Sequence, residues 1–308
     1  MGVSELSIGR TISFFISLLL TLSLPAQAMS AGLMVLYPEV REPYSKVYQD
    51  IIDGVKTTYN GSVMATPLKD RQSEDAYRAA VNSSKPDMII ALGQNALNLA
   101  SRIAPGVPTV MGATSATNLK VAGVSMIPDP AVVITKLHQL DSELSTIHVV
   151  TNPADKQKLL QAALKHANSL NIKFIVHEVT SIKDAASVYR DLLLRLGRHD
   201  SIWLMQDQAL NDISLLSLIL ERAWERKIIV FSSNPADVKR GALFSVYPNN
   251  VALGARLAEI TTTYDFSKES NHDIEFLREI LIAGNERTLR HLGLTTANEA
   301  HRVFDKKL

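Results

Sequence analysis

The feature that most constrains the fold of this chain is a regular alternation of short apolar runs with longer amphipathic ones. Residues 32–37 and 87–92 are short apolar runs bounded by turn residues, whereas residues 43–59 place Val47 and Val55 on one stripe at helical spacing. Short apolar strands that alternate with helices form parallel sheets covered on both faces. The pattern occurs in two sets of similar length, which predicts an α/β protein with two doubly wound parallel-sheet lobes.

The second set of elements ends in a short strand over residues 278–283, and residues 264–273 before it are polar. We interpret this polar stretch as a loop or as a crossing between the lobes. The chain contains no proline-rich or glycine-rich segment between the two sets. Several short crossings, rather than one flexible tether, are therefore expected to join the lobes as a hinge.

The N-terminal region has the layout of a secretory signal peptide. Residues 1–10 are polar, residues 12–24 are apolar, and Pro25 is followed by Ala26-Gln27-Ala28. This order of a polar head, an apolar stretch of about 7–15 residues and a small-residue exit is typical of cleaved leaders. We expect residues 1–28 to be removed and the mature protein to reach the periplasm; an uncleaved membrane anchor is the alternative.

Composition narrows the chemistry that this chain can perform. The sequence contains no cysteine, which excludes disulfides, thiolate metal sites, cysteine nucleophiles and a lipid anchor behind the leader. The formal net charge of +1 gives no indication of a nucleic-acid partner. The eight histidines are not spaced as metal ligands on any one element, and the sequence contains no catalytic motif. We therefore expect that the protein binds no metal or cofactor and is not an enzyme.

Polar and aromatic side chains follow the predicted strands. In open α/β sheets, ligands bind just beyond the carboxyl ends of the strands, near helix N-termini. The candidate ligand-binding residues at these positions are Tyr37, Glu39, Gln94, Asn95, Thr114, Asn152, Gln206, Asp207, Ser233 and Tyr247. Several of these residues have a structural alternative. Asn95, Thr114 and Asn152 are also typical of helix caps and turns, and the two tyrosines are also typical of core positions.

Four segments in the second half of the chain resemble one protein family. Residues 148–155 form a strand followed by Asn-Pro, residues 201–207 a strand followed by Asp, residues 241–249 a returning segment, and residues 292–294 a Leu-Gly-Leu turn. The order and spacing of these segments resemble ABC-transporter substrate-binding proteins of the type I periplasmic-binding fold. The similar family includes binders of tryptophan and other aromatic amino acids. The chain departs from it at residues 113–117, where the family commonly carries Asp-Pro, and at Lys227, where it often carries proline.

The resemblance implies a periplasmic protein that captures a small ligand between two lobes and delivers it to an ABC permease. It implies a first lobe of residues 31–126 plus 246–270 and a second of residues 127–245 plus 271–308. For an amino-acid-like ligand, Asp207 is expected to pair with the ammonium group. Helix N-termini near Gln94, Thr114 or Asn152 would take the carboxylate, and Tyr37 or Tyr247 would cover the side chain. A monomer is the default for this fold.

Two other functions fit parts of the same sequence. A periplasmic sensor subunit that passes a ligand signal to a membrane receptor kinase would have the same fold. An exported hydrolase would need a nucleophile and a base clustered at the strand ends, and the sequence contains no such cluster. Permease genes beside this one would favour transport, and a sensor kinase gene would favour signalling.

Overall fold

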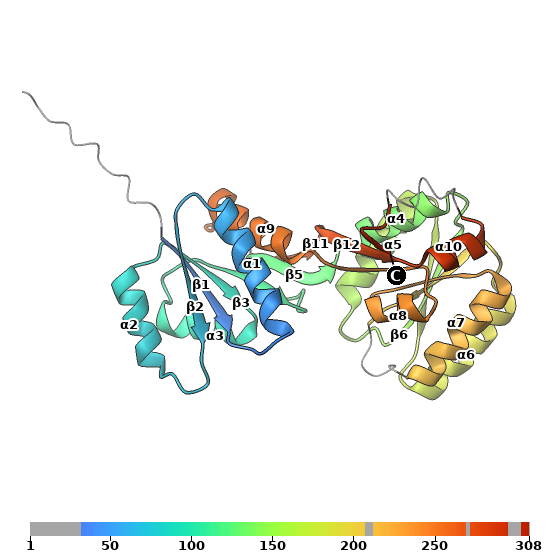
Figure 1. The fold of residues 1–308 in the computed structure, drawn as a ribbon, viewed down its shortest axis with the longest axis horizontal. Helices are drawn as coiled ribbons and strands as arrows, with labels where there is room; N and C mark the ends of the chain where they lie inside the picture. The colour runs from blue at the N-terminus through green and yellow to red at the C-terminus, as the bar shows by residue number, and fades with distance from the viewer. Residues whose placement is uncertain (1–31, 207–211, 269–271, 295–302, 308) are drawn as a thin grey trace, which may run out of the picture. The chain divides into compact units, whose positions relative to one another are not determined.

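The computed structural model describes residues 32–206, 212–268, 272–294 and 303–307. Within these residues the strands form a six-stranded sheet and a seven-stranded sheet, each flanked by helices (Figure 1). Two α/β lobes, as predicted, are therefore confirmed. The predicted signal peptide, residues 1–28, and the candidate residue Asp207 lie outside the described residues.

The first sheet is entirely parallel. Its strands are β1 (Gly32–Pro38), β2 (Ser62–Leu68), β3 (Met88–Leu92), β4 (Thr109–Thr114), β5 (Gly123–Pro128) and β11 (Ile274–Leu277). They lie in the order β11-β5-β4-β3-β1-β2, and each neighbouring pair runs parallel. The helices of this part are α1 (Tyr44–Thr58), α2 (Glu74–Ser84), α3 (Gln94–Ile103) and α9 (Asn250–Thr263).

In the second sheet two of the described strands run opposite to the other five. Its strands are β6 (Thr146–Thr151), β7 (Lys173–Glu178), β8 (Asp200–Leu204), β9 (Ile229–Ser232), β10 (Phe244–Pro248), β12 (Ile280–Gly284) and β13 (Lys306–Lys307). Their order is β13-β12-β10-β9-β8-β6-β7, and β12 runs antiparallel to β10 and parallel to β13. The helices here are α4 (Pro130–Leu140), α5 (Gln157–Ser169), α6 (Ile182–Arg195), α7 (Ile213–Arg226), α8 (Pro235–Arg240) and α10 (Glu286–Leu292).

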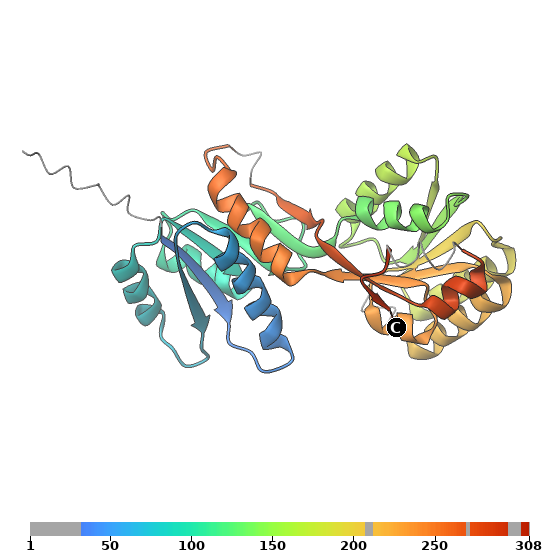
Figure 2. The same ribbon diagram turned by 45° about the horizontal axis from the view of Figure 1, so that its top comes forward.

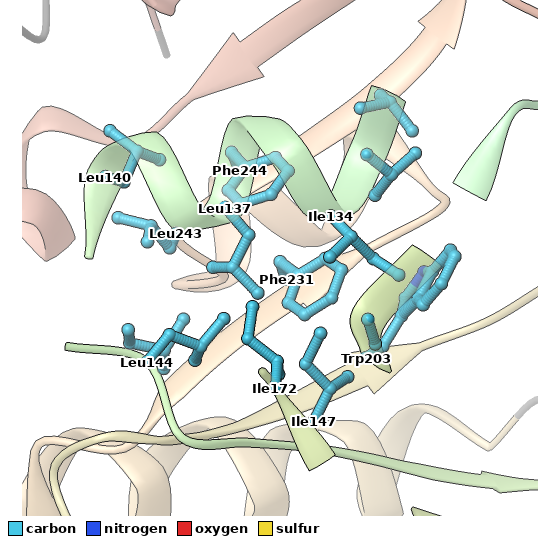
Figure 3. Close-up of a cluster of buried hydrophobic side chains, with 14 of the residues drawn as sticks. Ile134, Leu137, Leu140, Leu144, Ile147, Ile172, Trp203, Phe231, Leu243 and Phe244 are labelled. Carbon is cyan, nitrogen blue, oxygen red and sulfur yellow. The ribbon is translucent and has the colours of Figure 1, made fainter. Parts of the chain in front are cut away.

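Each sheet has a hydrophobic core on both faces, because successive strand residues point to opposite sides. In β1, Leu33 and Val35 join one buried cluster, while Met34 and Leu36 join the other. The second sheet follows the same rule, and Figure 3 shows the cluster around Phe231 on one of its faces. Burial on both faces explains why these strands are continuous apolar runs in the sequence.

Helices α1 and α9 cross in backbone contact through two glycines. A Cβ atom on Gly54 would lie 1.9 Å from the carbonyl oxygen of Val251, and one on Gly254 would lie 1.9 Å from that of Ile51. Both views of the ribbon show α9, in orange, lying along α1, in blue (Figure 1, Figure 2). Only residues without side chains allow helices to approach this closely.

The chain passes between the two sheets three times: from β5 to α4, from β10 to α9, and from β11 to β12. The crossing segments are bonded to one another. The Asp129 amide donates to the Leu277 carbonyl at 2.7 Å, the Asn249 amide donates to the Glu279 carbonyl at 3.1 Å, and Arg278 pairs with the Asp129 carboxylate at 3.2 Å. These short crossings agree with the expectation that several crossings, rather than one flexible tether, join the lobes.

The strand expected over residues 278–283 is confirmed as β12, which belongs to the second sheet. No strand is predicted for the residues just before it, whereas the structure has β11 there, in the first sheet. The predicted division places all of residues 271–308 in the second lobe, and the lobe boundaries stay a prediction. An apolar run reports burial but not which sheet buries it, so the sequence could not assign β11 to the first sheet.

Candidate functional site

One group of predicted residues gathers at the carboxyl edge of the first sheet. Strands β1, β3 and β4 are parallel neighbours, so their last residues meet at the same edge. Tyr37 is in β1, Glu39 follows that strand, Gln94 and Asn95 open α3 behind β3, and Thr114 ends β4. Glu39, Gln94 and Asn95 are exposed, whereas Thr114 is buried.

The expectation that Asn95 caps the helix it starts is wrong. The N-cap of α3 is Gly93, which has a φ of 89° and precedes Gln94. Asn95 is therefore the second residue of the helix, and among the described residues no side chain caps this N-terminus. The side-chain amide of Gln94 instead donates to the side-chain oxygen of Asn98, one helical turn further on, at 2.9 Å. The first N–H groups of α3 are left for solvent or another acceptor.

The last residues of β4 are strained in a way that the sequence does not indicate. Ala113 has a φ of 51°, and the pairing between β4 and β5 shifts register between Met111 and Thr114. The Thr114 hydroxyl then accepts from the Ala116 amide at 3.0 Å. A left-handed alanine is uncommon and costs about 1 kcal/mol. Such strain and bulges cluster at functional sites.

A second group of predicted residues lies at the carboxyl edge of the second sheet. Strands β6, β8 and β9 are parallel neighbours, and Asn152, Gln206 and Ser233 each follow one of them. Asn152 is half-buried, and its side-chain oxygen accepts from the Ala154 amide at 3.1 Å, which shapes the turn before α5. Gln206 is exposed. Contact of any of these side chains with a ligand stays a prediction.

Ser233 has a structural partner that the sequence did not indicate. Its hydroxyl accepts from the Trp203 indole N–H at 3.1 Å, and Trp203 is 2 % exposed. The start of α8 is capped by the next residue, Asn234, whose oxygen accepts from the Ala236 amide at 3.1 Å. Ser233 is therefore not the cap of α8; its hydroxyl orients the buried Trp203 indole.

Replacing Ser233 with alanine is expected to lower the free energy of unfolding by about 1–2 kcal/mol, because the buried indole N–H loses its acceptor. Chemical denaturation followed by tryptophan fluorescence measures the change. Ser233→Thr keeps a hydroxyl and should retain most of the stability. Ser217→Ala, on the exposed side of α7, is the matched control with little expected effect. An alanine variant at Ser233 as stable as that control would contradict the role of the hydrogen bond.

The two candidate tyrosines are half-buried where strands meet loops. The Tyr37 ring lies 6.4 Å from that of Tyr48 on α1, so it also packs against the first core. Tyr247 in β10 pairs with Leu281 of β12. Burial, together with the nearby Asp305 carboxylate, raises the pKa of the Tyr247 phenol.

The described residues contain neither a metal-binding cluster nor a membrane-spanning helix. No cluster of three or more His, Asp or Glu side chains in this part of the chain could hold a metal ion. No helix among the described residues has both the length and the apolar character needed to cross a bilayer.

The fold is similar to that of solved binding proteins. A substrate-binding protein with adhesive properties from Clostridium difficile, in its ligand-free open form, aligns with a TM-score of 0.59 at 17 % identity over 90 % of this chain and 99 % of its own. A conserved domain protein from Vibrio cholerae aligns with a TM-score of 0.50 at 17 % identity over 91 % and 100 %. At this identity the likeness establishes the fold and nothing about the ligand.

A third solved structure, an ABC domain from Streptococcus pneumonia in complex with L-Trp, aligns with a TM-score of 0.49 at 17 % identity over 91 % of this chain and 100 % of its own. No curated protein matches the sequence. The sequence profile described as "ABC transporter substrate binding protein" matches residues 54–265, which is more than half of the chain and includes strands of both sheets. The chain therefore belongs to the ABC transporter substrate-binding protein family.

Proposed function

We propose that this protein captures a small, amino-acid-like ligand between its two lobes and delivers it to an ABC permease. The family match over residues 54–265 carries this proposal, because the family binds ligands for ABC transport. Polar side chains at the carboxyl edges of both sheets support it, since this is where open α/β sheets bind ligands. Removal of the predicted leader after Ala28 would place the mature protein outside the cytoplasm, as is typical of the family.

The three crossings support ligand capture by hinge rotation. Short segments that absorb the rotation are the usual hinges of two-lobed binding proteins. The bonds between the crossings at Asp129, Asn249 and Leu277 keep these segments together as they bend. A ligand favours the closed form only by its higher affinity for that form. We propose the lobes to be residues 31–126 plus 246–270 and residues 127–245 plus 271–308, except that β11, within the last range, belongs to the first sheet.

The two sheet edges offer different groups to such a ligand. In this proposal the uncapped N-terminus of α3 binds the ligand carboxylate, because its free N–H groups and helix dipole favour an anion. Asp207 pairs with the ammonium group. Tyr37 or Tyr247 lies against the ligand side chain, where a half-buried ring covers apolar surface while its hydroxyl stays hydrated.

A thermal-shift screen of the mature protein tests the ligand class directly. Amino acids, short peptides, nucleosides and sugars are each added in excess to the purified protein. A ligand at about 100 times its dissociation constant adds about 2.7 kcal/mol to the free energy of unfolding. We expect an amino acid to raise the midpoint temperature of unfolding. A rise with sugars or nucleosides alone would contradict the proposal that the ligand is amino-acid-like.

Replacing Asp207 with alanine is expected to weaken binding of the amino acid found in this screen by about 30-fold to several thousand-fold, or about 2–5 kcal/mol, because a desolvated ammonium loses its counter-charge. Isothermal titration calorimetry measures the change. Asp191→Ala, which removes an exposed carboxylate from α6, is the matched control and should bind as the wild type does. Equal affinities for all three proteins would remove Asp207 from the site.

A further inference from the structure

Two histidines on neighbouring strands of the second sheet are bonded to each other. His148 in β6 and His177 in β7 place Nδ1 and Nε2 3.0 Å apart. Their ring centroids are 5.3 Å apart, and their planes differ by only 16°. Because the nitrogens are much closer than the centroids, the rings meet edge to edge in one plane. This is the geometry of an N–H···N hydrogen bond, in which the N–H of one ring points at the nitrogen lone pair of the other.

Such a bond contains one shared proton. A neutral imidazole has one N–H donor and one acceptor nitrogen, so one ring donates while the other accepts. A doubly charged pair has two N–H groups facing each other at this position, because both nitrogens of a charged imidazole are donors. The pair therefore tolerates charge on the donor ring but cannot stay bonded once the acceptor ring is protonated as well.

The surroundings of the pair oppose its protonation. His148 is 7 % exposed and lies on the same face of the sheet as Val150, whose cluster includes Tyr189 of α6. Burial is the largest effect that lowers the pKa of both histidines. The neighbouring His177 ring lowers the pKa of His148 further, and Arg195 of α6 lowers the pKa of both histidines.

Asp200 of β8 opposes these effects and raises the pKa of His148, although less than burial lowers it. Its carboxylate is already held by other donors. The Ser145 hydroxyl donates to one oxygen at 3.1 Å, and the Gly197 amide donates to the other at 2.8 Å. These two bonds hold the Asp200 carboxylate against Ser145 and Gly197.

We propose that the His148–His177 pair is an acid-sensitive clamp that holds the edge strand β7 on the second sheet. Among the described residues, strand β7 has a neighbour on one side only, β6, so side-chain contacts across that single ladder matter to its retention. In acid, the second proton replaces an attraction by a repulsion between two cations. The proposal concerns the stability of the second sheet and does not rest on the ligand-binding function.

Loosening of β7 in acid is expected to affect the candidate site at the end of β6. His177 pairs in register with Val150, and Glu178 pairs with Thr151, the last residue of β6. Asn152 follows directly, and its backbone oxygen accepts from Lys156 at 3.1 Å. Loosening of β7 therefore removes a neighbour from the strand end that positions Asn152.

The sign of the pH effect follows from the direction of these pKa shifts. Above the unfolded-state pKa of about 6.5, both histidines are neutral in both states and the clamp is intact. As the pH falls below this value, the unfolded chain binds protons that the folded protein resists, so the free energy of unfolding decreases. The loss continues until the pH passes the lowered pKa values of the folded state.

Thermal unfolding at a series of pH values between about 8 and 5 tests the clamp. His177→Gln is the informative variant, since a glutamine amide can replace the Nε2 acceptor but does not titrate. His166→Gln is the matched control: it removes a half-buried histidine that bonds to Thr135 and leaves the pair intact. We expect the wild type and the control to lose about 4 °C more than His177→Gln over this range.

A measurement on the wild type keeps the test decisive if the variant does not fold. Nitrogen-15 chemical shifts of the two imidazoles, followed over the same pH range, report their protonation directly. Hydrogen exchange of the β7 amides, corrected for the intrinsic rate, reports strand release. Titration below the ordinary histidine range with faster β7 exchange in acid supports the clamp. Ordinary titration of both rings, or equal pH profiles of all three proteins, overturns it.

Discussion

Gly254→Ala is expected to lower the free energy of unfolding by about 3 kcal/mol or more, a loss at the upper end for a single substitution. The added Cβ would lie 1.9 Å from the Ile51 carbonyl oxygen and 3.0 Å from the Val55 amide nitrogen. These are backbone atoms of α1, which cannot rotate away as a side chain could. The two helices must therefore separate, and the core between them and the first sheet opens.

Urea denaturation followed by circular dichroism measures this loss. Gly54→Ala should cost a similar amount, because its Cβ meets the Val251 carbonyl oxygen in the reciprocal contact. Gly106→Ala is the control, since a Cβ there meets no atom within 4 Å. If Gly254→Ala were as stable as Gly106→Ala, the helices could not be in backbone contact.

Phe231→Ala should destabilise the second sheet by about 3–5 kcal/mol, the usual cost of truncating a buried phenylalanine. Phe231 is 0 % exposed, and its ring lies 5.4 Å from the indole of Trp203 and 5.2 Å from the ring of Phe244 (Figure 3). Truncation leaves a cavity between two large aromatic groups that are themselves fixed by their strands. Urea denaturation followed by tryptophan fluorescence measures the change, since Trp203 lies beside the cavity.

The comparison with Phe231→Leu separates cavity formation from the loss of ring contacts. Leucine fills much of the same volume, so its cost should stay near 1–2 kcal/mol. A leucine variant as unstable as the alanine variant would mean that the stacked rings, rather than the filled volume, stabilise this core. Equal stability of the alanine variant and the wild type would contradict both explanations.

Much of the fold could be predicted because burial leaves a periodic pattern in the sequence. The helix expected over residues 43–59 is Tyr44–Thr58 in the structure, and the strand expected over residues 87–92 is Met88–Leu92. The pattern carries no information on contacts between distant segments. The approach of Gly54 to Gly254 was therefore missed, as was the membership of β11 in the first sheet.

The candidate site was predictable in position but not in detail. Parallel strands end at one edge, so the rule that placed Thr114 and Ser233 there needs only the order of elements. The bond from Trp203 to Ser233 and the left-handed Ala113 depend on backbone geometry that residue types do not specify. The His148–His177 pair was also missed, since two residues on different strands meet only when the register is known.

The glycine crossing of α1 and α9 has a consequence for how the chain acquires its structure. The first sheet starts at the N-terminal end of the described residues, yet α9 and β11 come after almost the whole second set of elements. Neither half can assemble fully until nearly all of the polypeptide has been synthesised. Contacts between such distant segments slow folding. A nascent chain of this kind stays incompletely packed for longer, which is the state that the proposed export would require.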